Sequence, residues 1–136
     1  MDFANKLRIL RQEKNLTQAE AAKLIDVSIR TYKGYELGER LPRDRKTYLN
    51  IADKFDVNLD YLMDSNQEFI VRAREKYGSK GAREARELAE DLAGLFAGGK
   101  LDEEDRKAVL ETIQEAYYMA KLNNKKYTPK KYSEDE

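Results

Sequence analysis

The chain has 136 residues, with 26 basic and 26 acidic side chains and therefore no net charge, and it contains neither cysteine nor histidine. This composition excludes disulfides, thiolate chemistry, a histidine general base and the usual transition-metal ligands, so we expect neither an enzyme nor a bound cofactor or metal. No apolar run has the length of a membrane span, and "MDFANKLRIL" lacks the apolar core of a signal peptide, which favours a cytoplasmic protein. Zero net charge counts mildly against a nucleic-acid-binding protein, although the charge of such a protein need only be local.

Apolar residues recur at i, i+4 and i+7 between Phe3 and Leu10, and they predict a first helix that ends near Asn15. A second helix is expected from Thr17 to Ile25. Its threonine N-cap is followed by a glutamate three residues later, which is the pattern of a capping box.

Asp26 marks a turn, and Ser28 is the expected N-cap of a third helix that runs to about Leu37. Gly38 predicts the end of this helix, because glycine readily adopts the left-handed conformation that closes a helix C-terminus. Residues 39–43 then form a loop.

A fourth helix is expected from about Asp44, and Asn58 is a candidate cap for a short fifth helix. Five helices joined by short turns predict a compact all-α domain over residues 1–64. The apolar residues of the last two helices are Tyr48, Leu49, Ala52, Phe55, Leu59 and Leu62.

The helical pattern weakens over residues 65–81. A helix can begin around Phe69–Tyr77, but Gly78, Ser79 and Gly81 indicate a linker.

Residues 82–124 predict two helices, over 82–97 and 102–122, broken by Gly98 and Gly99. A helical hairpin cannot bury its apolar face alone, so we expect this region to be a dimerisation or regulatory element. The expected dimerisation residues are Leu88, Leu92, Leu95, Phe96, Val109, Ile113 and Tyr117. The lysine-rich tail, residues 125–136, is either a flexible solubilising end or a contact with DNA.

The strongest functional signal is the pair of helices over 17–25 and 28–37, joined by the three residues "DVS". A tight turn makes the two helices cross steeply, so that one of them exposes its outer face. An arginine fork suits a guanine edge and an apolar side chain suits a thymine methyl, so the exposed face predicts a reader of the DNA major groove. The residues expected to pack inward are Ala21, Ala22, Val27 and Tyr32, and those expected to face outward are Ser28, Ile29, Arg30, Lys33 and Gly34.

The segments "LTQAEAAKLIDVSIRTYKGYELGERLP" and "LNIADKFDVNLDYLM" resemble the helix-turn-helix domain of the phage repressor-like (XRE/Cro-type) regulators, over residues 3–63. The resemblance implies a five-helix, lambda-repressor-like domain whose third helix enters the major groove. It implies base contacts from Ser28, Ile29, Arg30, Lys33 and Gly34, and phosphate contacts from Thr17, Gln18, Arg40, Arg43 and Lys46.

The same resemblance implies an internal salt bridge between Arg11 and Glu36. Gln18 has two open interpretations, a phosphate contact or a role in helix capping. Asp26 stands where the family commonly has a turn glycine, and aspartate tolerates left-handed geometry at a cost.

The segment "LFAGGKLDEEDRKAVLETIQEAYYMAKLNNKKYTPKKY", residues 95–132, resembles the tail of immunity repressors from Gram-positive phages and integrative elements. The resemblance implies repression of lytic or transfer promoters, with relief by an antirepressor or a metalloprotease partner. We therefore expect a prophage or mobile-element repressor that binds a double-stranded DNA operator as a homodimer. The alternative is an antitoxin-like or antirepressor-binding module that regulates its own expression through the helix-turn-helix.

Overall fold

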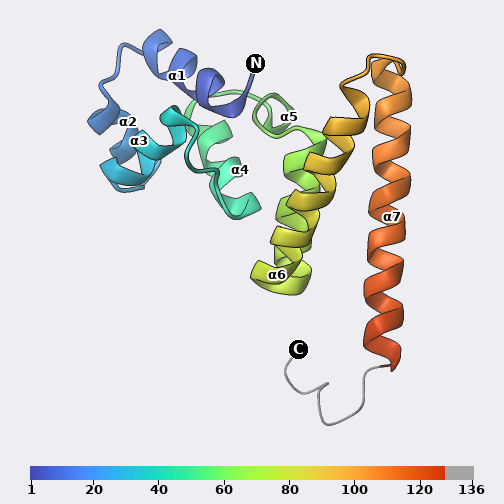
Figure 1. Ribbon diagram of the computed structural model, residues 1–136. Helices are drawn as coiled ribbons and strands as arrows, with labels where there is room; N and C mark the ends of the chain where they lie inside the picture. Colours follow the sequence, from blue (N-terminus) through green and yellow to red (C-terminus); the bar gives the residue numbers. More distant parts are fainter. Residues whose placement is uncertain (128–136) are drawn as a thin grey trace. The chain divides into compact units, whose positions relative to one another are not determined.

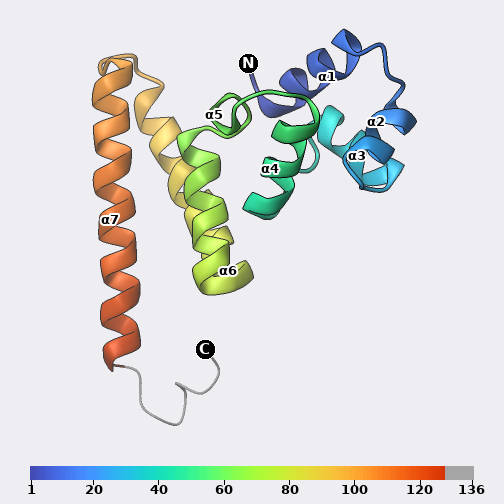
Figure 2. The ribbon, with the colours of Figure 1, turned by 180° about the vertical axis from the view of Figure 1, so that it is seen from behind.

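The computed structural model describes residues 1–127, with side chains described through residue 124. These residues form helices and no strands, as the sequence predicts (Figures 1 and 2). None of the described helices is both long and apolar enough to cross a membrane. The helices are α1 (Phe3–Glu13), α2 (Gln18–Leu24), α3 (Ile29–Leu37), α4 (Arg45–Lys54), α5 (Leu59–Leu62), α6 (Ser65–Phe96) and α7 (Glu103–Tyr127).

The chain divides into two compact units, one over residues 1–71 (unit 1) and one from residue 72 onward (unit 2). Unit 1 contains α1 to α5 and the start of α6. Unit 2 contains the rest of α6 and α7. The expected tail, residues 125–136, lies outside the residues whose side chains are described.

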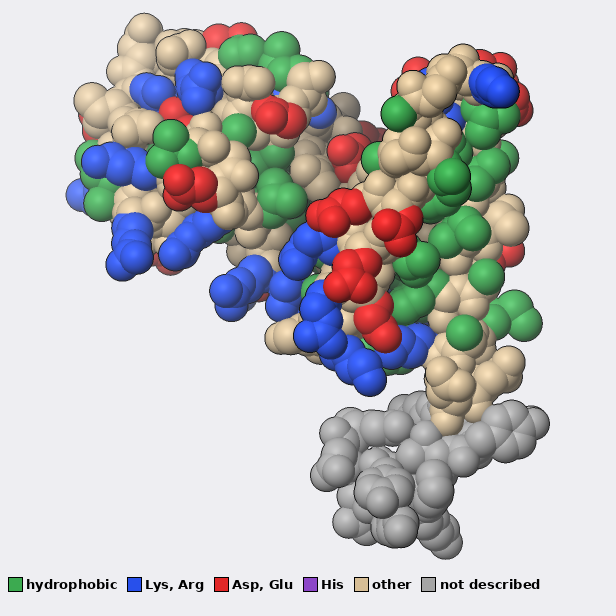
Figure 3. All heavy atoms as spheres, viewed as in Figure 1, with side chains coloured by type: hydrophobic (Ala, Val, Ile, Leu, Met, Phe, Trp, Pro, Cys, Tyr) green, Lys and Arg blue, Asp and Glu red, His purple; other side chains and the backbone are tan. Residues whose placement is uncertain are grey.

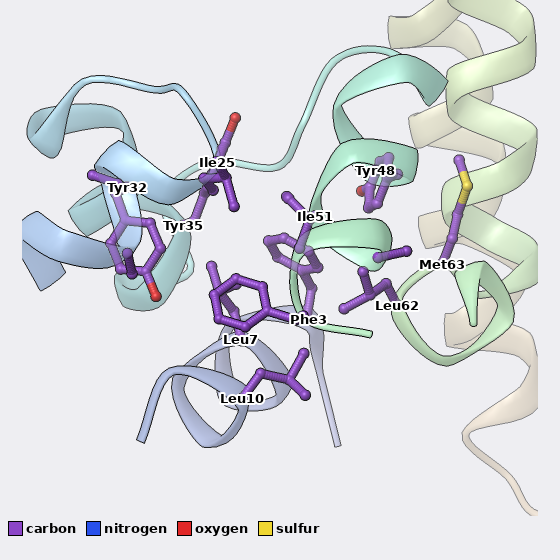
Figure 4. Close-up of a cluster of buried hydrophobic side chains, with 14 of the residues drawn as sticks. Phe3, Leu7, Leu10, Ile25, Tyr32, Tyr35, Tyr48, Ile51, Leu62 and Met63 are labelled. Atoms are coloured by element: carbon purple, nitrogen blue, oxygen red, sulfur yellow. The ribbon is translucent and has the colours of Figure 1, made fainter. Parts of the chain in front are cut away.

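Unit 1 closes around one aromatic and aliphatic core (Figure 4). The ring of Phe3 meets Tyr35 and Tyr48 edge-on, with centroids 5.8 and 5.6 Å apart. The prediction for α4 is wrong at one position: Leu49 is 48% exposed, and Ile51 is fully buried in its place. Ile51 lies three residues after Tyr48 on the helix, so both side chains fall on the inward face.

Three turns of unit 1, at residues 15–17, 26–28 and 56–58, share one backbone conformation and one pattern of hydrogen bonds. The first residue is Asn or Asp in the left-handed conformation, with φ of 55°, 58° and 54°. The second is apolar, and its N–H donates to the carbonyl five residues earlier at 2.9–3.2 Å, which closes a Schellman-type helix end. The third is the N-cap of the next helix. Each turn therefore ends one helix and starts another within three residues.

The segment expected to be a linker lies within α6, which reverses direction at Gly78 (φ 71°, ψ −157°). Figures 1 and 2 show the helix folding back there, so that α6 has a first arm (65–77) and a second arm (79–96). A Cβ added at Gly81 would lie 2.5 Å from the carbonyl oxygen of Ala73, so the two arms approach too closely for any residue except glycine. The glycines that indicated a linker thus allow the helix to fold back as a tight hairpin.

Unit 2 packs through small side chains. Its buried residues, among those whose side chains are described, are Ala73, Gly81, Ala82, Ala85, Ala89, Leu92 and Leu110. Alanines at this spacing on the second arm let neighbouring helices approach closely, but they bury little apolar area per residue. α7 begins after Asp102, whose carboxylate accepts the N–H of Asp105 at 2.8 Å. The acidic first turn of α7 also suits the positive end of the helix dipole.

Candidate nucleic-acid interface

α3 has one face in the core of unit 1 and one face in solvent. Tyr32, Tyr35 and Glu36 are buried, and Tyr32 has no exposed surface. The Ser28 hydroxyl caps the helix by accepting the N–H of Thr31 at 3.0 Å. The exposed residues at the start of α3 are Ser28, Ile29, Arg30 and Lys33. The helix therefore presents a polar, basic first turn with one apolar side chain.

The residues expected to pack inward, behind the exposed face of α3, lie in or against the core of unit 1. Ala21 and Ala22 are buried in α2, and Val27 is half-buried against the same core. Asn50 of α4 also supports the turn before α3, because its amide donates to the carbonyl of Ile25 at 2.9 Å. The start of α3 is thus fixed by α2, α4 and its own cap.

Glu36 is the only buried charged residue among those described, at 3% exposure, and it joins three helices. Arg11 of α1 donates to both carboxylate oxygens, at 2.7 and 3.1 Å, which is the ion pair expected from the resemblance. Gln18 of α2 donates to one of them at 3.2 Å. Arg8, which the sequence did not single out, donates to the Glu36 carbonyl at 2.9 Å. This network fixes the orientation of α3 relative to α1 and α2.

The charges in this network are mutually stabilised. Burial alone would raise the pKa of Glu36, but hydrogen bonding by Arg11 and Gln18 and the charge of Arg11 outweigh it, so the pKa of Glu36 is lowered. The hydrogen bond with Glu36 likewise raises the pKa of Arg11. The pKa of Tyr32 is raised, chiefly by burial. The pair therefore stays ionised and Tyr32 stays neutral at neutral pH.

Two expected phosphate ligands have structural bonds of their own. Gln18 is half-buried at the first position of α2, with its amide nitrogen directed to Glu36. Thr17 forms the predicted capping box: its hydroxyl accepts the N–H of Glu20 at 3.1 Å, and the Glu20 carboxylate accepts the N–H of Thr17 at 2.9 Å. Thr17 is therefore the cap of α2, and the amide of Gln18 binds Glu36 and caps no helix.

Gly34 was expected to face outward, and the structure corrects this. The residue is buried, and the side chain of Arg40 lies over it. A Cβ at Gly34 would lie 3.0 Å from Cδ and 3.1 Å from Cγ of Arg40. Because the chain turns back after Gly38, the loop returns across the last turns of α3 and needs the space that glycine leaves. The absence of a side chain at Gly34 leaves space for the side chain of Arg40, and it does not expose the backbone of α3 to solvent.

The remaining expected phosphate ligands, Arg40, Arg43 and Lys46, are exposed in the loop after α3 and the first turn of α4. Figure 3 shows Lys and Arg side chains on the surface over α2 and α3. The structure thus joins Arg11, Gln18 and Glu36 in one network, and it distributes the exposed cations over α3 and the segment that follows.

The expected dimerisation residues of unit 2 differ in exposure. Leu92 is buried within the chain, whereas Leu95 is 77% exposed. Tyr117 is half-buried, and its hydroxyl donates to the carboxylate of Glu84 at 3.1 Å. Four others, Leu88, Phe96, Val109 and Ile113, are half-buried. The exposed apolar residues that the sequence did not single out are Leu101, Met119 and Leu122.

Comparison with known proteins gives relatives both of unit 1 and of the longer chain. The family model described as helix-turn-helix matches residues 7–62. The HTH-type transcriptional regulator YqaE of Bacillus subtilis (strain 168) is 33% identical over 117 residues, which cover 83% of this chain and 90% of that protein. The immunity repressor protein of Bacillus phage phi105 is 26% identical over an alignment of 144 residues, covering 100% of this chain and 99% of that protein.

A third relative matches a shorter segment. The cryptic phage CTXphi transcriptional repressor RstR of Vibrio cholerae is 38% identical over 79 residues, which cover 54% of this chain and 70% of that protein. No solved structure matches the chain.

Proposed function

The chain belongs to the XRE-type helix-turn-helix family of DNA-binding transcriptional regulators, and on that premise we propose that it is a sequence-specific repressor of prophage or mobile-element type that binds its operator as a dimer. Proteins of this family bind DNA and are not enzymes. Repression is the stated role of the phage phi105 and CTXphi relatives, and we extend it to this chain.

The exposed first turn of α3 is the observation that carries the proposal. Arg30 and Lys33 lie in solvent beside Ile29, which is 45% exposed, while the opposite face of the helix is buried. An exposed arginine at the start of a rigid helix matches the bidentate contact to the O6 and N7 atoms of guanine, and an exposed isoleucine suits a thymine methyl. We assign base reading to Arg30 and Ile29, with Ser28 and Lys33 beside them.

Backbone contacts on either side would set the register of α3 in the groove. Arg40, Arg43 and Lys46 are exposed cations after α3, and Thr17 and Gln18 lie at the N-terminus of α2, where backbone N–H groups favour a phosphate. Gln18 can do this while it stays bonded to Glu36, because its amide nitrogen carries two N–H donors and the bond to Glu36 uses one of them. The Glu36 network then couples phosphate contact at α2 to the position of α3.

A dimer follows from the size of the reading surface. One α3 helix reads only a few base pairs, and helix-turn-helix repressors gain specificity from two half-sites about 34 Å apart, one helical turn of DNA. Unit 2 has exposed apolar side chains, including Leu95 at 77% exposure, which supports its assignment as the dimerisation element.

A gel-shift titration of the protein on the DNA upstream of its own gene, competed with random duplex, tests the proposal. We expect saturable binding that random duplex displaces only at about 1,000-fold excess or more. Equal competition by random duplex would reduce the protein to a non-specific DNA binder, and the absence of any shift would remove DNA binding altogether.

A further inference from the structure

Exposed apolar side chains lie at both ends of unit 2. Leu95 and Leu101, 77% and 37% exposed, flank the connection between α6 and α7. Met119 and Leu122, 64% and 65% exposed, lie near the other end of α7. Figure 3 shows hydrophobic side chains along the seam between α6 and α7, from one end of this unit to the other. A strip of this kind in water favours burial against another apolar surface.

The charges of unit 2 are divided between the same two ends. Residues 72–86, around the reversal at Gly78, carry six basic and two acidic side chains and form the basic end. Residues 87–107, on the far half of the second arm and the start of α7, carry seven acidic and three basic side chains and form the acidic end. Lys121 belongs to the basic end in space, because its ammonium group pairs with Glu84.

Local helix stability accounts for part of this division. Glu103, Glu104 and Asp105 lie in the first turn of α7, where negative charge is favourable. Glu87, Glu90 and Asp91 lie in the second half of α6, more than one turn before its end at Phe96, where the helix dipole has little effect on them. The dipole therefore does not explain Glu87, Glu90 and Asp91, and a partner of opposite charge would.

We propose that unit 2 pairs with unit 2 of a second copy in antiparallel orientation, so that the basic end of each protomer lies against the acidic end of the other. The contact is two-fold symmetric, because the same two patches serve in both copies. It also places Leu95 and Leu101 of one copy toward Met119 and Leu122 of its partner. Parallel pairing would bring like charges together at both ends and is disfavoured. The inference rests on the proposed dimer and specifies its orientation.

The absence of cysteine from the chain gives a direct test. Leu95→Cys and Met119→Cys each place one thiol at an exposed position of the full-length protein. The two variants are mixed, allowed to exchange subunits, and treated with a flexible bifunctional thiol reagent. We expect a cross-linked dimer in the mixture and little or none with either variant alone. Asp53→Cys, at an exposed position of α4, replaces Met119→Cys in a matched control mixture that should not cross-link.

Cross-linking of Leu95→Cys with itself would indicate parallel pairing and overturn the proposal. Absence of cross-links in every mixture would overturn it as well, because the four apolar positions would not meet. Operator binding and dimer mass, measured on the unmodified protein by gel shift and light scattering, report separately on the proposed function. A parallel dimer that binds its operator would therefore refute the orientation and leave the repressor intact.

Charge reversal provides an independent readout. Lys80→Glu with Arg83→Glu removes the net charge of the basic end of unit 2, and Glu90→Lys with Asp91→Lys removes the net charge of the acidic end. All four side chains are exposed, so the folded hairpin should tolerate these changes. We expect each doubly substituted protein to dimerise at least about tenfold more weakly, and an equimolar mixture of the two to regain part of the dimerisation through the one pair of unlike ends that the mixed dimer keeps. Failure of the mixture to recover would contradict pairing of unlike ends.

Discussion

The two units of the chain bury their apolar residues in opposite ways. The largest fully buried side chains of the described residues, among them Tyr32, Tyr48 and Phe69, all lie in unit 1. Unit 2 buries mainly alanines and leaves Leu95, Met119 and other large side chains in solvent. Unit 1 therefore has a core of large side chains, whereas unit 2 has small side chains in its core and, by the proposal above, covers its exposed apolar residues with a second copy. Stability and assembly should respond separately to substitutions in the two units.

Leu7→Ala in the core of unit 1 gives the largest expected effect. Leu7 has no exposed surface, so the substitution leaves a cavity and should lower the free energy of unfolding by about 2–5 kcal/mol. Leu95→Ala in unit 2 is the matched control. It should change the unfolding of the monomer by less than about 0.5 kcal/mol while weakening the dimer. Equal losses of stability from both substitutions, measured by denaturant titration at low protein concentration, would erase the contrast between the units.

Glu36→Gln tests the network behind α3. The substitution removes the charge that Arg11 and Gln18 bind, and it should cost about 2–3 kcal/mol of stability at neutral pH. Because the pKa of Glu36 is lowered in the folded state, its contribution is complete above the ordinary glutamate value of 4.5 and is lost as pH falls through the lower, folded-state pKa. The difference in stability between the two proteins should therefore shrink in acid. A difference that is constant from pH 7 to pH 3 would show that Glu36 acts only through its shape.

Arg30→Ala addresses the reading face without touching the core. We expect a loss of about 1–3 kcal/mol on the cognate operator, with preference relaxed at one base pair and the thermal stability unchanged. Lys46→Ala is the comparison, since the loss of a phosphate contact should weaken binding to all duplexes and lower the salt dependence by about one unit. Equal weakening by Arg30→Ala on cognate and random duplex would reduce Arg30 to charge neutralisation.

Gly34→Ala should have a smaller effect, which passes through Arg40. A methyl group at residue 34 displaces the Arg40 side chain by a few tenths of an ångström or more, because the two would otherwise lie 3.0 Å apart. We expect operator binding to weaken by no more than Arg40→Ala weakens it, about 1 kcal/mol for one phosphate contact, and the double substitution to add nothing. Additive losses of binding free energy in a double-substitution cycle would show that Gly34 and Arg40 act independently.

Asp26→Gly gives the smallest expected change. Asp26 has a φ of 58°, which glycine adopts without the clash that an L side chain incurs. We expect a net gain of about 0.5 kcal/mol in stability, seen as a rise in Tm. The gain is small because glycine also gives the unfolded chain more freedom, which offsets part of the relief. Operator binding should stay the same. A lower Tm would mean that the Asp26 side chain stabilises the turn in another way.

The sequence predicted unit 1 well because its helix ends are locally encoded. Thr17 and Ser28 are caps in both the prediction and the structure, and Gly38 ends α3 as expected. The exposed face of α3 follows from its apolar spacing. The prediction that failed at Gly34, its exposure, concerns a contact from outside the helix, because Arg40 of the following loop covers this residue. Helical spacing alone placed Gly34 outward, because spacing carries no information about which loop covers a helix.

Unit 2 was predicted less well for the same reason. Glycines such as Gly78 and Gly81 are typical both of a flexible linker and of a tight helical reversal. Only the close approach of Gly81 to Ala73 distinguishes the two structures. The apolar stripe of α7 was visible in the sequence, but its division between intrachain packing and solvent was not. Asn58 was expected to cap α5, and it occupies the N-cap position without a side-chain hydrogen bond.

The three-residue turns of unit 1 have a consequence for how this domain folds. Each turn closes the helix it ends with a backbone hydrogen bond, and two of the three also cap the next helix through the side chain of Thr17 or Ser28, so these contacts join residues that are neighbours in the chain. Little loop entropy must be lost before these contacts form, and domains dominated by local contacts fold on the microsecond-to-millisecond timescale. The geometry between α2 and α3 can thus be established early, before the core around Tyr48 is complete.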